Sequence, residues 1–345
     1  MLVQNARITL LAMALVMAML TQLWPTEVHA DASLKDLHTM VNIDEWHKAG
    51  YKGKGVEIVV IDKGELSLSY DNIKKVEDPF GNVFTKKKTD SHLSKVVETI
   101  HLNAPDAKIY VFQDISMIHI HDWIVKEEKD IDLMNFSLSR NLTEKEKKVM
   151  PLFAEKDVLM VTAIGNNGEE KINPVALNPY WTSVGAVEKT RDGFELAVYS
   201  GIHDTVDFVS FTSIPLQDGS FLGTSASAPF LTGTVATYLN GYEKNRHDTP
   251  GRPELIDMMK DNVLKPVTMD ARKYGNGVFR LPSLRMFEKA SDEKLPETIT
   301  TKKDKLPGTR GTSTQIFQLQ KHNIMTVTKE MRTMKLNFLP QGTKE

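Results

Sequence analysis

The chain has 345 residues, which is enough for one large domain or two modest ones. Its formal net charge of −2 gives no electrostatic argument for binding nucleic acid or a membrane surface, so neither is expected as a partner. The sequence contains no cysteine, which excludes disulfides, thiolate zinc sites and cysteine catalysis. Hydrophobic residues make up 41% of the chain and charged residues 26%, as in a globular protein with a substantial core.

The N-terminus has the features of an export signal. Arg7 precedes an apolar run over residues 8–20, and Ala30 ends a segment of small residues suitable for cleavage. An uncleaved anchor is the alternative, but a spanning helix needs roughly 20 apolar residues, and polar residues at 21–22 interrupt this run. We therefore expect a signal peptide over residues 1–30, and a secreted or cell-surface protein that is not held in a membrane after cleavage.

Apolar strand-like runs alternate with helical segments in the next part of the chain, after a polar and weakly helical stretch. Strands are expected at 56–61, 108–112, 131–138, 158–164, 183–187 and 206–211. Helices are expected at 94–100, 119–129 and 143–156, and a buried helix at 230–239. The first strand is a β-branched run, apolar on both faces, as in a parallel strand that is covered on both sides. The alternation predicts βαβ units and therefore an α/β protein with a mostly parallel central sheet flanked by helices.

Four polar residues stand at the ends of these elements. Asp62 follows the first strand, His92 opens a helix, Asn166 follows the fourth strand, and Ser225 precedes the buried helix. Functional groups gather outside the carboxyl ends of strands in open α/β sheets. Unpaired backbone N–H groups at a helix N-terminus favour an oxyanion. Taken singly, Asp62 could merely start a turn and Ser225 could merely cap a helix.

The order aspartate, histidine, serine along the chain is the order found in subtilisin. Five segments resemble the subtilisin-like (S8) serine peptidases, namely 55–62, 135–139, 165–168, 223–229 and 274–278. The serine motif, Gly-Thr-Ser-Ala-Ser-Ala-Pro at 223–229, is the most specific of them. The resemblance covers the chain from about Asn42 to Leu284.

This resemblance implies a serine endopeptidase with the three-layer subtilisin-like fold, acting on a protein or peptide substrate. Ser225 would attack the peptide carbonyl, His92 would transfer the proton, and Asp62 would orient the imidazole. The side chain of Asn166 and the backbone N–H of Ser225 would bind the oxyanion. The substrate-binding residues would be Ser137, Leu138, Ser139 and Gly165. No cofactor and no metal are expected.

Several positions depart from the family pattern. The histidine is followed by Leu93-Ser94-Lys95 in place of Gly-Thr-His, and the Leu93 side chain is expected beside the substrate. Lys63 replaces a small hydroxyl residue after the aspartate, and Ser139 replaces a glycine of the pocket wall. The alternative to an active enzyme is therefore a weakly active or non-catalytic relative that binds a peptide or partner protein in its groove.

Two features of many secreted relatives have no counterpart in the expected arrangement. The connection after Ile100 is too short for a calcium-binding loop, because hard cations need about 6–8 oxygen ligands. The stretch between the expected cleavage site and Gly50 is too short for an inhibitory propeptide that assists folding.

The family resemblance ends near Leu284, and the composition then changes. We expect a catalytic domain over 31–289, then a linker over 290–313 that is rich in Lys, Asp, Glu, Thr, Gly and Pro. Short alternations of apolar and polar residues predict a small β-rich segment at 314–345. The tail from Ser291 onward holds ten Lys or Arg and six Asp or Glu, which gives +4. Such a tail could contact an anionic cell surface, although a solvated appendage is the simpler interpretation.

Overall fold

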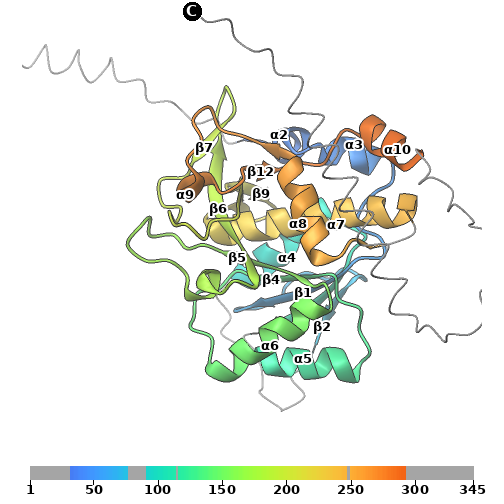
Figure 1. The fold of residues 1–345 in the computed structure, drawn as a ribbon, viewed down its shortest axis with the longest axis vertical. Coiled ribbons are helices and arrows are strands. Elements are labelled where there is room, and N and C mark those ends of the chain that lie inside the picture. The colour runs from blue at the N-terminus through green and yellow to red at the C-terminus, as the bar shows by residue number, and fades with distance from the viewer. Residues whose placement is uncertain (1–31, 77–90, 114–115, 247–248, 293–345) are drawn as a thin grey trace, which may run out of the picture. The chain divides into compact units, whose positions relative to one another are not determined.

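The computed structural model describes residues 32–76, 91–113, 116–246 and 249–292 (Figure 1). The expected signal peptide and β-rich segment lie outside these residues, as does most of the expected linker. The chain divides into two units, Met1–Glu293 and Lys294–Glu345, and every described residue belongs to the first. Among the described helices, none combines the length and apolar character that crossing a membrane requires.

The described residues form an alternating series of helices and strands. The helices are α2 (Leu34–Met40), α3 (Ile43–Lys48), α4 (His92–Asn103), α5 (Met117–Lys126), α6 (Glu144–Glu155), η1 (Pro174–Leu177), α7 (Thr224–Arg246), α8 (Arg252–Asp261), α9 (Ala271–Tyr274) and α10 (Leu284–Asp292). The strands are β1 (Glu57–Asp62), β2 (Ile73–Lys75), β3 (Lys108–Gln113), β4 (Leu133–Phe136), β5 (Leu159–Ala163), β6 (Trp181–Lys189), β7 (Phe194–Leu196), β8 (Phe208–Phe211), β9 (Ile214–Leu216), β10 (Gly219–Phe221), β11 (Val263–Leu264) and β12 (Val278–Phe279).

The central sheet has the strand order β11-β12-β8-β6-β5-β4-β1-β3-β2, with β7 paired to β6. β1 lies between β3 and β4 and is parallel to both, with Ile58 opposite Ile109 and Leu133. Only β7 and β11 pair antiparallel within the described part of this sheet, while β9 and β10 form a separate hairpin. The α/β class with a mostly parallel sheet is therefore confirmed.

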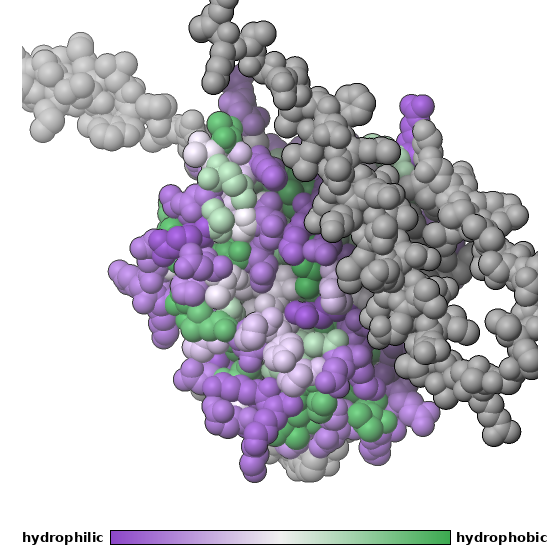
Figure 2. Space-filling view, in the orientation of Figure 1, coloured by the Kyte–Doolittle hydropathy of each residue, from purple (hydrophilic) through white to green (hydrophobic). Residues whose placement is uncertain are grey.

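Helices cover both faces of the sheet, with α5 and α6 on one side and α4, α7 and α8 on the other (Figure 1). The alternation of side chains along β1 divides its residues between these two layers. Ile58 and Val60 pack in the core under α4 and α7, whereas Val59 and Ile61 pack in the core under α5 and α6. Hydrophilic side chains cover most of the described surface in the view of Figure 2.

The contact between α4 and α7 depends on a small residue. A Cβ atom added to Gly233 of α7 would lie 2.6 Å from the Cβ of Asn103 and 2.8 Å from the carbonyl oxygen of Ile100, both on α4. No side chain fits there, so glycine lets the two helices approach closely. α4 begins at His92 and α7 begins at Thr224, and the ring of His92 contacts that of Phe221, three residues before α7, so the N-terminal ends of both helices lie in the same region.

Candidate active site

The structure brings Asp62 and His92 into direct contact. Asp62 ends β1 and its side chain is 0% exposed, while the side chain of His92 is 27% exposed. Nδ1 of His92 lies 2.7 Å from Oδ1 of Asp62. Because an ionised carboxylate only accepts hydrogen bonds, Nδ1 carries the proton in the neutral imidazole. Nε2 is then the nitrogen that can accept a proton from a nucleophile.

Backbone and side-chain bonds tie the loop after β1 to the start of α4. The backbone N–H of Lys63 donates to Oδ1 of Asp62 at 2.6 Å, so this position supports the aspartate without a hydroxyl side chain. Ser94 Oγ donates to the carbonyl of Glu65 and accepts from the backbone N–H of Ser67. The expectation that Leu93 lies beside the substrate is wrong, because its side chain is fully buried in the core.

Ser225 is the second residue of α7 and is half-buried. Four residues earlier, the ring of Phe221 stands edge-on to the ring of His92, with centroids 5.4 Å apart. The turn that leads into Ser225, residues 221–225, is called the serine turn. It therefore lies next to the histidine. The structure contains no hydrogen bond between Ser225 and His92, both of which it describes. In structures without substrate, such bonds are often long and tighten only in the complex.

Asn166 lies on the turn after β5 and contacts the residue before the serine. Its Oδ1 accepts hydrogen bonds from the backbone nitrogen and from Oγ1 of Thr224, each at 2.9 Å. Thr224 Oγ1 in turn accepts from the backbone N–H of Gly165 at 3.2 Å. A Cβ atom on Gly223, which has a φ of +99°, would lie 3.1 Å from Nδ2 of Asn166. The amide nitrogen therefore lies against the backbone that leads into Ser225.

The residues expected to line the specificity pocket follow β4. Ser137 is buried, Leu138 is half-buried and Ser139 is exposed. Nδ2 of Asn173 donates to the carbonyl of Leu138 at 2.9 Å and to the carbonyl of Ala163 at 2.8 Å. Asn173 is only 3% exposed and fastens the ends of the neighbouring strands β4 and β5 together. Sequence reasoning missed Asn173, because an asparagine before a proline indicates only a loop.

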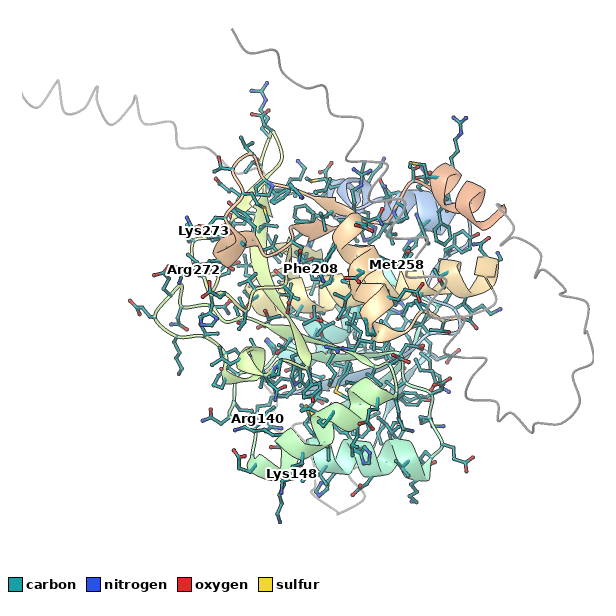
Figure 3. All side chains as sticks on the ribbon, in the orientation of Figure 1. Arg140, Lys148, Phe208, Met258, Arg272 and Lys273 are labelled. Atoms are coloured by element: carbon teal, nitrogen blue, oxygen red, sulfur yellow. The ribbon has the colours of Figure 1, made fainter. Side chains whose placement is uncertain are left out.

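An ion pair anchors the loop that follows this wall. Both terminal nitrogens of Arg140 donate to the carboxylate of Glu146, at 2.7 and 2.9 Å (Arg140 is labelled in Figure 3). Burial of Glu146 opposes its ionisation, but hydrogen bonds from Arg140 and from the backbone N–H groups of Thr143 and Met117 outweigh it. The pKa of Glu146 is therefore lowered to about 2.

The part of the chain that the structure describes contains no group of three or more His, Cys, Asp or Glu side chains that could hold a metal ion. The connection between α4 and β3 runs only from Ala104 to Ala107.

No family model matches the chain, whereas comparison with curated proteins finds a protein of similar sequence. The minor extracellular protease Epr of Bacillus subtilis (strain 168) is 25% identical over 269 residues. This alignment covers 66% of the present chain but 39% of Epr, so the chain spans about two fifths of that relative's length.

Solved structures show the same fold. A lanthipeptide protease superposes with a TM-score of 0.57 at 17% identity, over 72% of this chain and 93% of that one. The prenylagaramide maturation protease PagA gives 0.56 at 15% identity, over 69% and 95%. At these identities the likeness concerns the fold alone. Fold and sequence relative together confirm that this chain resembles the subtilisin-like serine peptidases and has their α/β fold.

Proposed function

We propose that the chain is an exported serine endopeptidase that uses Asp62, His92 and Ser225 for catalysis and Asn166 in the oxyanion hole. The observation that carries this proposal is the 2.7 Å hydrogen bond between the buried carboxylate of Asp62 and Nδ1 of His92. A buried carboxylate on that nitrogen is the arrangement that a histidine base requires.

The reaction would follow from the chemistry of these groups. Ser225 Oγ attacks the peptide carbonyl while Nε2 of His92 takes its proton and then passes it to the leaving amine. Asp62 stabilises the imidazolium without itself becoming protonated. The oxyanion is bound by Nδ2 of Asn166 and the backbone N–H of Ser225. Water then hydrolyses the acyl intermediate, with His92 again as the base.

Substrate recognition would use the two segments that Asn173 links. Ser137, Leu138 and Ser139 would form one wall of the specificity pocket, and Gly165 would lie on the other, next to the oxyanion donor. Because Asn173 bonds to both segments, the width of the pocket is supported by a buried hydrogen-bond network.

Export is supported by the predicted signal peptide and by the extracellular location that the name of the relative Epr gives. The basic tail beyond Asp292 lies outside the described residues, and its contact with a cell surface stays a prediction.

Labelling with a fluorophosphonate, followed by mapping of the modified peptide, tests the proposal. We expect the label on Ser225, no label after Ser225→Ala, and unchanged labelling after Ser227→Ala, because Ser227 is fully buried. Hydrolysis of a peptide amide should follow the same pattern. A wild-type chain that binds peptides but neither reacts with the probe nor hydrolyses the amide would contradict the proposal and favour the non-catalytic alternative.

A further inference from the structure

We propose that Tyr199 and Thr212 form a hydroxyl clamp that positions the serine turn, an inference that rests on the proposed peptidase function. The backbone N–H of Gly223, two residues before Ser225, donates to both hydroxyl oxygens. It lies 3.1 Å from the hydroxyl of Tyr199 and 2.9 Å from Oγ1 of Thr212. The two hydroxyl oxygens are 3.0 Å apart.

The hydrogen bonds within the clamp are all made under one assignment of the hydroxyl protons. Thr212 Oγ1 lies 3.2 Å from the carbonyl oxygen of Gly223, to which it can only donate. When its single proton makes this bond, the proton between the two hydroxyls comes from Tyr199. Each hydroxyl then donates once, and both share the Gly223 N–H. The clamp supplies the acceptors for the N–H of the buried Gly223, whereas the Gly223 carbonyl also accepts from the backbone N–H groups of Ala226 at 2.9 Å and Ser227 at 3.3 Å.

Gly223 has no side chain that could fix the serine turn, so hydrogen bonds to its backbone must do so. Its φ of +99° favours glycine, and a Cβ atom there would lie only 3.1 Å from Nδ2 of Asn166, closer than most Cβ contacts. The next residue, Thr224, bonds to Asn166, and Ser225 follows directly. A shift of the Gly223 backbone would therefore move the nucleophile and the oxyanion donor together.

Tyr199 also contacts the turn that carries Asn166. The carbonyl oxygen of Tyr199 accepts from the backbone N–H of Gly168 at 3.1 Å, at the end of that turn. The residue that follows is held to the sheet, because Ser200 Oγ accepts from the backbone N–H of Ala186 in β6 at 2.9 Å. Tyr199 therefore bonds to the turn that carries Asn166 through its carbonyl oxygen and to the serine turn through its hydroxyl.

Tyr199 and Thr212 are positioning residues, since they act on the reacting groups through Gly223. Small misplacements of a nucleophile are costly for turnover. After loss of either hydroxyl, the Gly223 N–H keeps the other as a partner, so we expect each single loss to lower kcat about threefold to tenfold. After loss of both, a buried N–H has no partner, and the effect should exceed the product of the single effects.

The experiment compares Tyr199→Phe, Thr212→Val and the double variant with wild type. The measurements are kcat and KM on a peptide amide, the rate of fluorophosphonate labelling and the melting temperature. Thr212→Ser retains the hydroxyl and should recover most of what Thr212→Val loses. Tyr110→Phe is a matched control, because its hydroxyl contacts Glu57 at the start of β1, away from the site. We expect kcat and the labelling rate to fall in the clamp variants while KM stays nearly constant. Tyr110→Phe should change neither kcat nor labelling.

The result that overturns the inference is an active wild type whose Tyr199→Phe variant keeps its kcat, or loses only melting temperature as Tyr110→Phe does. If the loss of kcat in the double variant equals the product of the two single losses, the two hydroxyls do not act through a shared Gly223 N–H. A wild type without serine reactivity would refute the proposed function instead. Amide exchange in the peptide that contains Gly223 then decides the clamp alone: faster exchange in the double variant supports it, and unchanged exchange refutes it.

Discussion

Oδ1 of Asn166 lies 2.9 Å from the backbone nitrogen of Thr224. A backbone N–H can only donate, so the atom that faces it must be the amide oxygen, and the opposite atom is the nitrogen donor. The oxyanion donor of the proposed site is therefore already oriented in a protein without substrate. Donors fixed before the reaction stabilise developing charge without reorganisation.

Replacement of Asn166 should lower turnover and leave substrate affinity nearly unchanged, because its amide nitrogen meets charge only in the transition state. We expect Asn166→Ala to reduce kcat by about 10²–10³-fold, a magnitude that comes from the equivalent asparagine of subtilisin. Steady-state kinetics on a peptide amide measures both constants. Asn167→Ala changes an exposed neighbour and serves as control. Unchanged kcat in the Asn166 variant would remove this residue from the oxyanion role.

Replacement of Glu146 should loosen the loop behind the proposed pocket wall. Glu146→Gln leaves Arg140 without its anionic partner, and we expect the free energy of unfolding at pH 7 to fall by on the order of 2 kcal/mol. Its folded pKa of about 2 is below the ordinary value of 4.5, so the contribution is present above pH 4.5 and lost as pH falls toward 2. Urea unfolding at pH 7 and pH 3 measures this. Glu144→Gln, on the exposed start of α6, should change little at either pH.

Acid should weaken the docking of α2 on α4 through His38. Nε2 of His38 bonds to Oδ1 of Asn103 at 2.9 Å, and burial lowers the pKa of His38 although Asp44 lies 3.9 Å from its other nitrogen. A lowered folded pKa means that the stabilisation is complete above the ordinary value of about 6.5 and is lost as pH falls through the folded pKa. His38→Gln should therefore flatten the decline in unfolding free energy below pH 6.5. If the unfolding free energies of variant and wild type fall in parallel with pH, His38 does not cause the loss of stability in acid.

Asp132 should have the opposite pH dependence. Burial raises its pKa to about 7, with smaller contributions from the charges of Asp130, Glu243 and Glu57. A carboxyl with a raised folded pKa contributes stability that is complete below pH 3.8 and is lost as pH rises through 7. Asp132→Asn retains an oxygen for the Glu57 N–H at 2.8 Å and cannot ionise. Between pH 5 and 8 the wild type should lose unfolding free energy relative to this variant, which chemical denaturation at several pH values measures.

The order of strands and helices could be predicted because it depends on local pattern. The β-branched run at 56–61 corresponds to β1, and the segment at 143–156 corresponds to α6, opened by the Thr143 cap. The short hairpin of β9 and β10 was not predicted, since strands of three residues carry almost no periodicity. Leu93 was misplaced because sequence cannot tell which way the second residue of a helix faces.

The contacts within the site could be predicted from the sequence only in part. The Asp62–His92 pair is thirty residues apart, and only the family resemblance suggested it. The hydroxyl clamp and the Asn173 bonds join segments that lie far apart in the chain, and their residue types are ordinary for loops. Such contacts are fixed by the packing of β5, β6 and α7, which no local pattern encodes.

Removal of the C-terminal tail should leave the first unit, Met1–Glu293, folded and with the proposed activity. The described chain ends in α10, and the unit boundary falls after Glu293. We therefore expect a chain ending at Glu293 to keep the melting temperature and the peptide hydrolysis of the full protein, because few contacts cross a linker. A large fall in melting temperature would instead mean that residues 314–345 add buried structure to this unit.

A chain ending at Ser283 is the informative comparison, because it also removes α10. Phe287 of α10 is 7% exposed, and its ring centroid lies 4.8 Å from that of Trp46 and 5.8 Å from that of Tyr238. Loss of a buried aromatic side chain costs about 3–5 kcal/mol. At about 2–4 °C per kcal/mol for a domain of this size, the melting temperature should fall by roughly 6–20 °C. If both truncations melt like the full chain, α10 contributes no stability and its packing on Trp46 is incidental.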